Sequence, residues 1–242
     1  MSVFVIADLH LSTNRITNKS MEVFGKRWTG YTEKLQKNWK AVVSEEDTVI
    51  IPGDISWALT PEEALPDLLF LNALPGKKLI GKGNHDYWWA TAKKLSELFS
   101  ANGIHTISLL HNTAYDCSDF IAVGTRGWFN DGSLKMPPNT DYAKLVNREN
   151  ERLKLSLAEA RRLCGDEDRE IIAFLHFPPV RGSFVCRPLV DTLKEAGITR
   201  CFYGHIHGDY LTPQTACFEG ISFSLIAADY LNFLPMPVFP EK

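Results

Sequence analysis

Apolar and polar positions follow two patterns along the chain, which together predict an α/β protein. Short runs of β-branched and other apolar residues indicate strands, and segments with apolar residues three or four positions apart indicate helices between several of them. The predicted strands cover residues 3–7, 47–51, 77–80, 104–108, 113–117, 120–123, 170–175, 199–203, 215–218 and 222–227. The predicted helices cover a segment that ends at residue 43 and residues 60–74, 88–99, 142–164 and 188–195.

Three of these helices carry further sequence signals. The helix over residues 60–74 opens with an N-capping Thr60, a proline at its first position and two acidic residues in its first turn. The helix over residues 88–99 should end before Asn102-Gly103. The long helix over residues 142–164 has one apolar face, so we expect it to pack against a sheet and to leave its charged residues in solvent.

The middle of the chain differs from its two ends. The short strands at 104–108, 113–117 and 120–123 look antiparallel, and a turn-rich loop over residues 124–140 follows them. The order of elements, with a late run of adjacent strands, favours two sheets packed face to face and flanked by helices, with parallel strands in the front half. A length of 242 residues suits a single domain over residues 1–242.

Charge and cysteine content narrow the class of protein. The chain has 26 Lys plus Arg against 29 Asp plus Glu, a formal net charge of −3, so nothing in the whole-chain charge attracts nucleic acid or an anionic membrane. The five cysteines are scattered without a CxxC pair, which favours reduced thiols in a cytosol. The N-terminal apolar run is too short for a signal peptide, and no segment reaches the roughly 20 apolar residues of a membrane helix. We therefore expect a cytoplasmic protein without a membrane partner or an evident protein partner.

Clusters of potential metal ligands follow five of the predicted strands. In open α/β sheets, the loops beyond the strand ends converge on one crevice, where ligands bind. Five of the seven histidines belong to these clusters. The clusters are Asp8-Leu9-His10, Gly53-Asp54, Gly83-Asn84-His85-Asp86, His176 and Gly204-His205-Ile206-His207.

The residue types in these clusters suit first-row divalent cations. Mixed oxygen and imidazole ligands favour Mn, Fe or Zn, whereas a purely oxygen set favours Mg or Ca. Two cations about 3.5–4 Å apart need a shared anion, and Asp54 at a strand end is the natural candidate. The Asn84 amide oxygen can add a ligand without adding charge. The neighbouring glycines permit close approach of the backbone and positive φ.

Each cluster taken alone has a simpler interpretation. Asp-x-His and Gly-Asp are common in turns, and Gly-Asn-His-Asp could be a loop with left-handed residues. His-x-His after a strand is only moderately specific, and His176 could be a core histidine that simply ends its strand. The joint occurrence of all five clusters at strand ends favours the metal site.

The ordered motifs D-x-H, GD, GNHD, H and GHxH, over residues 8–207, resemble those of the calcineurin-like metallophosphoesterase superfamily. The resemblance implies a four-layer α/β/β/α sandwich of two packed mixed sheets, with a dinuclear metal centre at the sheet edge. It implies that Asp8, His10 and His207 bind one metal, that Asp54 bridges, and that Asn84, His176 and His205 bind the second. His85 would stay free of metal and protonate the leaving group or steady the phosphoryl charge. Residues 21–28 look more like an uncharacterised bacterial phosphohydrolase branch.

Asp86, next to the implied catalytic His85, has an open role. Asp86 is the candidate to orient a neighbouring group, and an N-cap at the start of the helix over 88–99 is an equal alternative. After Asp54 the chain reads Ile55-Ser56-Trp57-Ala58, where the phosphoprotein phosphatases carry an aspartate and an arginine. This difference argues against a protein-serine/threonine phosphatase.

The function hypothesis is therefore a phosphoesterase that uses two divalent metal ions. It would hydrolyse a small phosphomonoester or phosphodiester, with nucleotides among the candidates, by in-line attack of a metal-bridging hydroxide. Arg126 and Arg181 are candidate phosphate ligands, and Trp57 with Trp88 and Trp89 could form an aromatic wall for base stacking. The alternatives are a nuclease of the same superfamily, disfavoured by the acidic balance, and a non-enzymatic scaffold that a metal stabilises.

Overall fold

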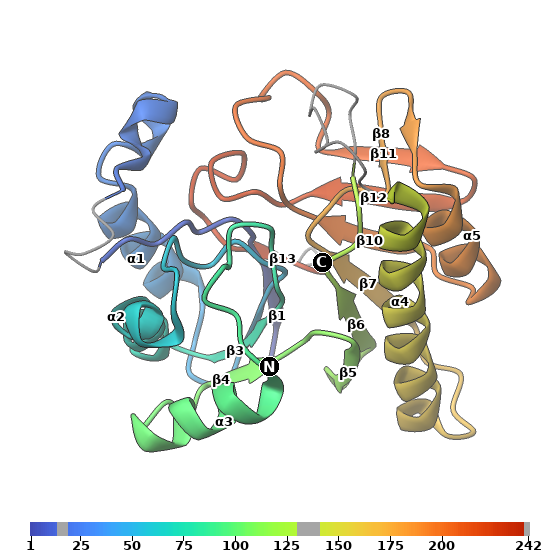
Figure 1. Ribbon diagram of the computed structural model, residues 1–242, viewed down its shortest axis with the longest axis horizontal. Coiled ribbons are helices and arrows are strands. Elements are labelled where there is room, and N and C mark those ends of the chain that lie inside the picture. The colour runs from blue at the N-terminus through green and yellow to red at the C-terminus, as the bar shows by residue number, and fades with distance from the viewer. Residues whose placement is uncertain (14–18, 130–140, 240–242) are drawn as a thin grey trace.

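Two mixed sheets form the centre of the protein, whose structure is a computed structural model that describes residues 1–13, 19–129 and 141–239 (Figure 1). The first sheet has the strand order β13 (Met236–Pro237), β1 (Val3–Val5), β2 (Thr48–Ile51), β3 (Lys77–Ile80) and β4 (Ile107–Leu109). The second has the order β11 (Thr215–Phe218), β12 (Ile221–Leu225), β10 (Arg200–Tyr203), β7 (Ile171–Leu175), β6 (Ile121–Thr125) and β5 (Thr113–Asp116). A separate hairpin pairs β8 (Val180–Arg181) with β9 (Phe184–Val185).

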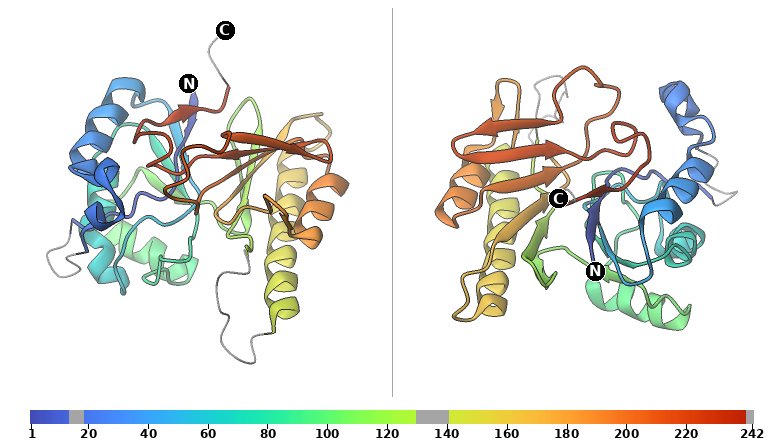
Figure 2. Two further views of the ribbon diagram at one scale, coloured as in Figure 1. Left: turned by 90° about the horizontal axis from the view of Figure 1, so that it is seen from above. Right: turned by 180° about the vertical axis from the view of Figure 1, so that it is seen from behind.

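Helices cover the outer face of each sheet, which gives the predicted α/β/β/α layers (Figure 2). The first sheet is covered by α1 (Tyr31–Val42), α2 (Pro61–Asn72) and α3 (Ala92–Ala101), and the second by α4 (Tyr142–Cys164) and α5 (Arg187–Glu195). Two 3-10 turns, η1 (Met21–Phe24) and η2 (Lys26–Trp28), precede α1. Within the described residues, no helix is both long and apolar enough to cross a bilayer.

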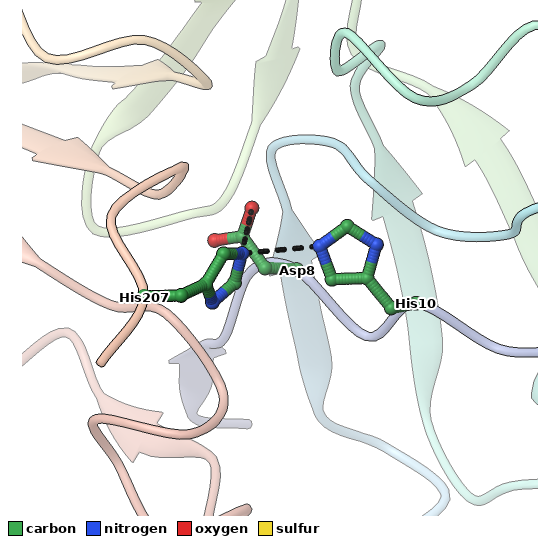
Figure 3. Close-up of side chains that lie close together, drawn as sticks. All are labelled: Asp8, His10 and His207. Carbon is green, nitrogen blue, oxygen red and sulfur yellow. Dashed lines mark hydrogen bonds and ion pairs between the residues drawn. The ribbon is translucent and has the colours of Figure 1, made fainter. Parts of the chain in front are cut away.

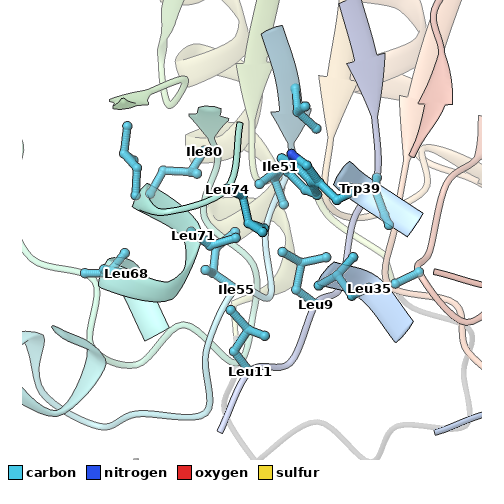
Figure 4. Close-up of a cluster of buried hydrophobic side chains, with 14 of the residues drawn as sticks. Leu9, Leu11, Leu35, Trp39, Ile51, Ile55, Leu68, Leu71, Leu74 and Ile80 are labelled. Carbon is cyan, nitrogen blue, oxygen red and sulfur yellow. The ribbon is translucent and has the colours of Figure 1, made fainter. Parts of the chain in front are cut away.

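The core fills the three interfaces between these layers. Val49 and Ile51 of β2 point to the outer helices, where they join the cluster shown in Figure 4, while Ile50 points to the second sheet. The second sheet likewise buries Ala173 and Leu175 of β7 against α4 and α5, and its other face against the first sheet. Because both faces of these strands are covered, their sequences are continuous apolar runs rather than alternating ones.

Most of the predicted elements are present, with shifts at their ends. Strand β3 and helix α4 have the predicted bounds, and Thr60 caps α2 through a hydrogen bond from Glu63 N to its hydroxyl (3.2 Å). The front strands β1 to β3 are parallel, as expected. All five cysteines are free thiols, as their spacing predicted.

Two predictions about elements were wrong, and two elements were missed. Strand β4 is parallel to β3, not antiparallel, because α3 carries the chain back across the sheet between them. Helix α3 begins at Ala92 rather than at residue 88, since Thr91 is its N-cap. Strand β13 and the β8–β9 hairpin were not predicted. The turn-rich loop is described only up to residue 129, and its remainder lies outside the described residues.

One further prediction, about the charged residues of α4, was also wrong. We expected the charged residues of α4 to be solvated, but the side chain of Glu149 is completely buried. It lies among arginines of α4 and of the loop after β6. This buried cluster becomes important below.

Candidate metal centre

The loops that follow β1, β2, β3, β7 and β10 carry the predicted ligands, and the structure brings these loops together. Ala7, just after β1, pairs with the end of β12 through the Ala7 N to Ile226 O bond (2.8 Å), which joins the two sheets. Asp8 N bonds Gly53 O (3.0 Å) and His10 N bonds Asp54 O (2.9 Å), so the first two loops run side by side. The His205 backbone N donates to the Asp8 carboxylate (2.8 Å), which ties in the loop after β10.

The backbone at these positions is held in a rarely occupied conformation. Asp8, His10, Asp54 and His205 have φ of 60°, 46°, 52° and 70°. Left-handed backbone at residues other than glycine costs about 1–3 kcal/mol each and persists where the surrounding structure enforces it, commonly at functional sites. The fold therefore holds these four residues in a less stable backbone conformation, which directs their side chains towards one site.

Two ligand groups share the Asp8 carboxylate. The first is Asp8, His10 and His207, in which the two imidazole Nε2 atoms are 3.0 Å apart and His207 Nε2 is 3.7 Å from Asp8 Oδ1 (Figure 3). The second is Asp8, Asp54 and His176, in which His176 Nδ1 is 3.7 Å from Asp8 Oδ1. Each group could hold a cation between its atoms.

Asp54, a member of the second group, also lies close to the first. Its Oδ2 is 3.6 Å from His10 Nε2 and also 3.6 Å from His176 Nε2. The same His176 Nε2 atom is 2.7 Å from Asn84 Oδ1. The ring of His205 lies beside that of His176, with centroids 5.3 Å apart. All seven predicted ligands thus gather in one region.

The electrostatics of these buried side chains fit a bound cation. Burial raises the pKa of Asp8 to about 7, and burial together with Asp86 and Asp8 raises the pKa of Asp54 well above its usual range. Burial and the surrounding histidines hold the pKa of His10 and of His176 well below the usual value, so both rings are neutral. Within the described residues, Asp54 Oδ2 and His176 Nδ1 are buried without a hydrogen-bond partner. A bound cation would stabilise the charged carboxylates that burial disfavours, and neutral imidazoles have the free lone pair that coordinates a metal ion.

Two glycines permit this close packing. A Cβ on Gly83 would overlap the Asp54 carboxylate, and a Cβ on Gly204 would overlap that of Asp8. Side chains at these positions would displace the ligands, so the glycines of the motifs have a steric reason.

Asp86 orients neighbouring groups and is not the N-cap of the next helix. Its carboxylate accepts hydrogen bonds from the backbone N of Asp54 (2.9 Å), Ile55 (2.9 Å), Ser56 (3.2 Å) and Gly83 (2.8 Å), and from Trp88 Nε1 (3.0 Å). The helix that follows is capped by Thr91 instead. Asp86 therefore fixes the loops after β2 and β3 to each other and holds Asp54 in place.

Asp229, which the sequence analysis missed, supports His207 from behind. Its Oδ1 is 3.0 Å from His207 Nδ1, and its Oδ2 accepts hydrogen bonds from Gly208 N and Tyr210 OH (2.9 Å each). Burial opposes ionisation, but these partners lower the pKa of Asp229, so the carboxylate stays charged. This bond leaves His207 Nε2 facing Asp8, which is the usual way a carboxylate orients a metal-binding histidine. Asp229 follows the end of β12. A search for polar residues after each predicted strand would have found it if that strand had been included.

His85 lies at the edge of the ligand groups, and its buried Nδ1 atom has no hydrogen-bond partner among the described residues. Burial, with the nearby Lys19 and His207, lowers its pKa to about 4, so the ring is neutral at pH 7. Its ring packs against that of Trp57 (centroids 4.3 Å apart), which also stacks on His10 (4.8 Å). Trp57 is buried, so it positions these two histidines rather than forming part of an open wall.

The other residues predicted to contact the substrate differ in their burial and in their partners. Arg181 is paired with Asp209. Arg126 is mostly buried and lies 3.2 Å from Glu149 Oε1. Trp88 is buried and bonded to Asp86, whereas Trp89 is partly exposed and lines a cavity beside Arg126.

Comparisons with known proteins agree with this geometry. The profile of the calcineurin-like phosphoesterases matches residues 1–209, and the chain belongs to that family. No curated protein matches the sequence.

Two solved structures share the fold at low sequence identity. A protein of unknown function from Aquifex aeolicus, AQ665, has 16% identity and a TM-score of 0.50, over 98% of this chain and 95% of the other. The protein TT1561 of Thermus thermophilus has 11% identity and a TM-score of 0.55, over 94% of this chain and 89% of the other. At these identities the likeness concerns the fold alone.

Proposed function

We propose that the protein is a phosphoesterase that holds two divalent metal ions in the pocket formed by the five strand-end loops. Family membership supports metal-dependent hydrolysis of phosphate esters in general. The observation that carries the dinuclear arrangement is Asp54 Oδ2, which is buried, unpaired within the described residues and 3.6 Å from histidines of both ligand groups. One carboxylate in this position can bridge two cations and offset their repulsion.

In this proposal, Asp8, His10 and His207 hold one ion, Asp54 bridges, and Asn84, His176 and His205 hold the other. Mixed carboxylate, amide and imidazole ligands favour Mn, Fe or Zn. When bound, the cations would activate water and offset the charge on the phosphoryl oxygens. Asp86 and Asp229 keep the ligands in place through the hydrogen bonds described above.

His85 steadies negative charge in the proposal. Its lowered pKa makes the ring neutral at pH 7, so its N–H can donate a hydrogen bond to a phosphoryl or leaving-group oxygen, whereas proton transfer would require the imidazolium. Its backbone N donates to Asp54 Oδ1 (2.8 Å), which fixes the loop that carries it beside the metal ligands. The substrate is a small phosphomonoester or phosphodiester.

The test is hydrolysis by metal-reconstituted protein. We expect turnover of p-nitrophenyl phosphate or bis(p-nitrophenyl) phosphate with Mn, Fe, Zn or Co, and loss of both metal and turnover in Asp54→Asn. Asp119→Asn, on the exposed turn between β5 and β6, is the matched control and should behave as wild type. A folded protein that retains its metals but hydrolyses no phosphate ester would contradict the proposal and favour the scaffold alternative.

A further inference from the structure

A cavity of about 720 Å³ lies beside the metal centre, between α3 and α4, and its lining is strongly basic. It opens at the carboxyl ends of β3, β4 and β6, which form the same edge of the two sheets that carries the metal ligands (Figure 1). The lining includes an aromatic side chain, Trp89, and a neutral amide, Asn112. Its cationic members are Lys82, Lys94, Arg126, Arg148 and Arg152.

The acidic side chains of the described residues do not balance the positive charge around this cavity. Three guanidinium groups share a single carboxylate oxygen, Glu149 Oε1, at 3.2 Å from Arg126, 3.7 Å from Arg148 and 2.6 Å from Arg152. Lys82 and Lys94 form no ion pair within the described part of the chain. Buried or half-buried charge is costly unless it is paired, so such an excess favours a bound anion.

Two polar atoms at the cavity are buried and lack a partner among the described residues. They are Arg126 Nε and His111 Nδ1. Burial, with Arg152, Lys82 and Arg126 nearby, lowers the pKa of His111 to about 3, so its ring is neutral and offers one N–H donor. A guanidinium with a free N–H and a neutral imidazole both suit phosphate oxygens.

The cavity and the metal centre are built on the same loops. Lys82 stands two residues before Asn84, and the backbone O of Arg126 accepts a hydrogen bond from Phe177 N (2.9 Å), the residue after His176. The loop after β3 thus contributes Lys82 to the cavity and Asn84 to the metal centre, and the loop after β6 is bonded to the residue that follows His176.

We infer that the basic cavity binds a second phosphate group, and that the substrate is a small molecule with two separate phosphates. One phosphate ester is hydrolysed at the metal centre, and the other is held by the cationic side chains. The substrate class rests on the proposed function, whereas phosphate binding by the cavity does not depend on it.

The first arm of the test measures anion binding by calorimetry. Inorganic phosphate and pyrophosphate are titrated into the full chain, both metal-loaded and after chelation of the metals with EDTA. The cavity variant is Lys94→Gln with Arg148→Gln, whose side chains are exposed or half-exposed, and it keeps Arg126 and Arg152 paired with the buried Glu149. The control is Lys93→Gln with Arg162→Gln, which removes the same charge from exposed positions outside the cavity.

In the chelated protein, we expect the cavity variant to lose at least about tenfold in phosphate affinity, since each lost charge-assisted hydrogen bond contributes on that order. The control should stay within about twofold of wild type, and thermal melting should show both variants folded. Equal affinity in the two variants, or citrate binding as tightly as pyrophosphate, would overturn the assignment.

The second arm compares glucose 1,6-bisphosphate with glucose 6-phosphate as substrates. The cavity variant should raise KM for the bisphosphate with little change in kcat, and leave the monophosphate kinetics unaltered. A bisphosphate KM unchanged by the variant would refute the substrate class even if phosphate binds the cavity. Absence of turnover with every metal and ester would defeat the proposed function, while the binding arm would still decide the role of the cavity.

Discussion

Replacing Asp86 by asparagine should destabilise the protein strongly, although the two side chains have nearly the same shape. One oxygen of Asp86 accepts from Asp54 N and Gly83 N, and the other accepts from Ile55 N, Ser56 N and Trp88 Nε1. An amide NH2 cannot accept, so whichever way the asparagine turns, at least two donors lose their partner and face another donor.

The size of the effect follows from these contacts. Hydrogen bonds to a charged group contribute roughly 1.5–3 kcal/mol each, so two lost bonds amount to roughly 3–6 kcal/mol. Burial raises the pKa of Asp86, so removing the charge returns part of its desolvation cost. We expect a net loss of about 3 kcal/mol in the free energy of unfolding.

The assay is urea unfolding of Asp86→Asn in the presence of EDTA, which separates loop stability from metal affinity. Asp119→Asn is the control, since its side chain is exposed, and it should change stability by less than about 0.5 kcal/mol. A loss below about 1 kcal/mol for Asp86→Asn would show that Asp86 does not hold the two loops together.

Three further predictions concern single side chains. Asp229→Asn should weaken metal affinity by about 10–100-fold in chelator competition, because His207 loses the partner that orients it, whereas an unchanged affinity would remove Asp229 from the metal centre. His85→Ala should retain both metals by elemental analysis yet lower kcat by about 10²–10³-fold, because it removes a hydrogen-bond donor to the developing charge, and a fall in metal content would instead make His85 a ligand. Hydrogen bonds from Arg187 and Lys194 lower the pKa of Glu219 to about 2, so its stabilising contribution is present above its ordinary pKa and disappears as the pH falls towards 2. In Arg187→Gln, NMR titration should show a higher pKa for Glu219 than in the wild type. An unchanged pKa would refute the ion pair in solution.

The sequence predicted the layers and the ligand-bearing loops because both depend on local pattern. Strands buried on both faces must be continuously apolar, and the polar residues at their ends stand out against that background. Helix α4 was predicted at its observed bounds since its apolar face repeats over 23 residues.

Most of the misses involve partners that are distant in the sequence. The bond between Asp229 and His207, and the three backbone donors that the loop after β2 presents to Asp86, become visible only when separate loops meet. Glu149 was predicted to be solvated because helical spacing cannot show that Arg126, from the loop after β6, approaches it. The orientation of β4 was wrong because the run of short strands was judged by itself, without the helix that precedes it.

The most direct test of the metal centre is the metal content of the purified protein, measured by elemental analysis after reloading with Mn, Fe or Zn and removal of unbound ions. The arrangement of Asp8 and Asp54 predicts about two ions per chain for wild type, and a clear loss of bound metal in Asp54→Asn. A wild-type protein that is folded and binds one ion or none under these conditions would contradict the dinuclear centre.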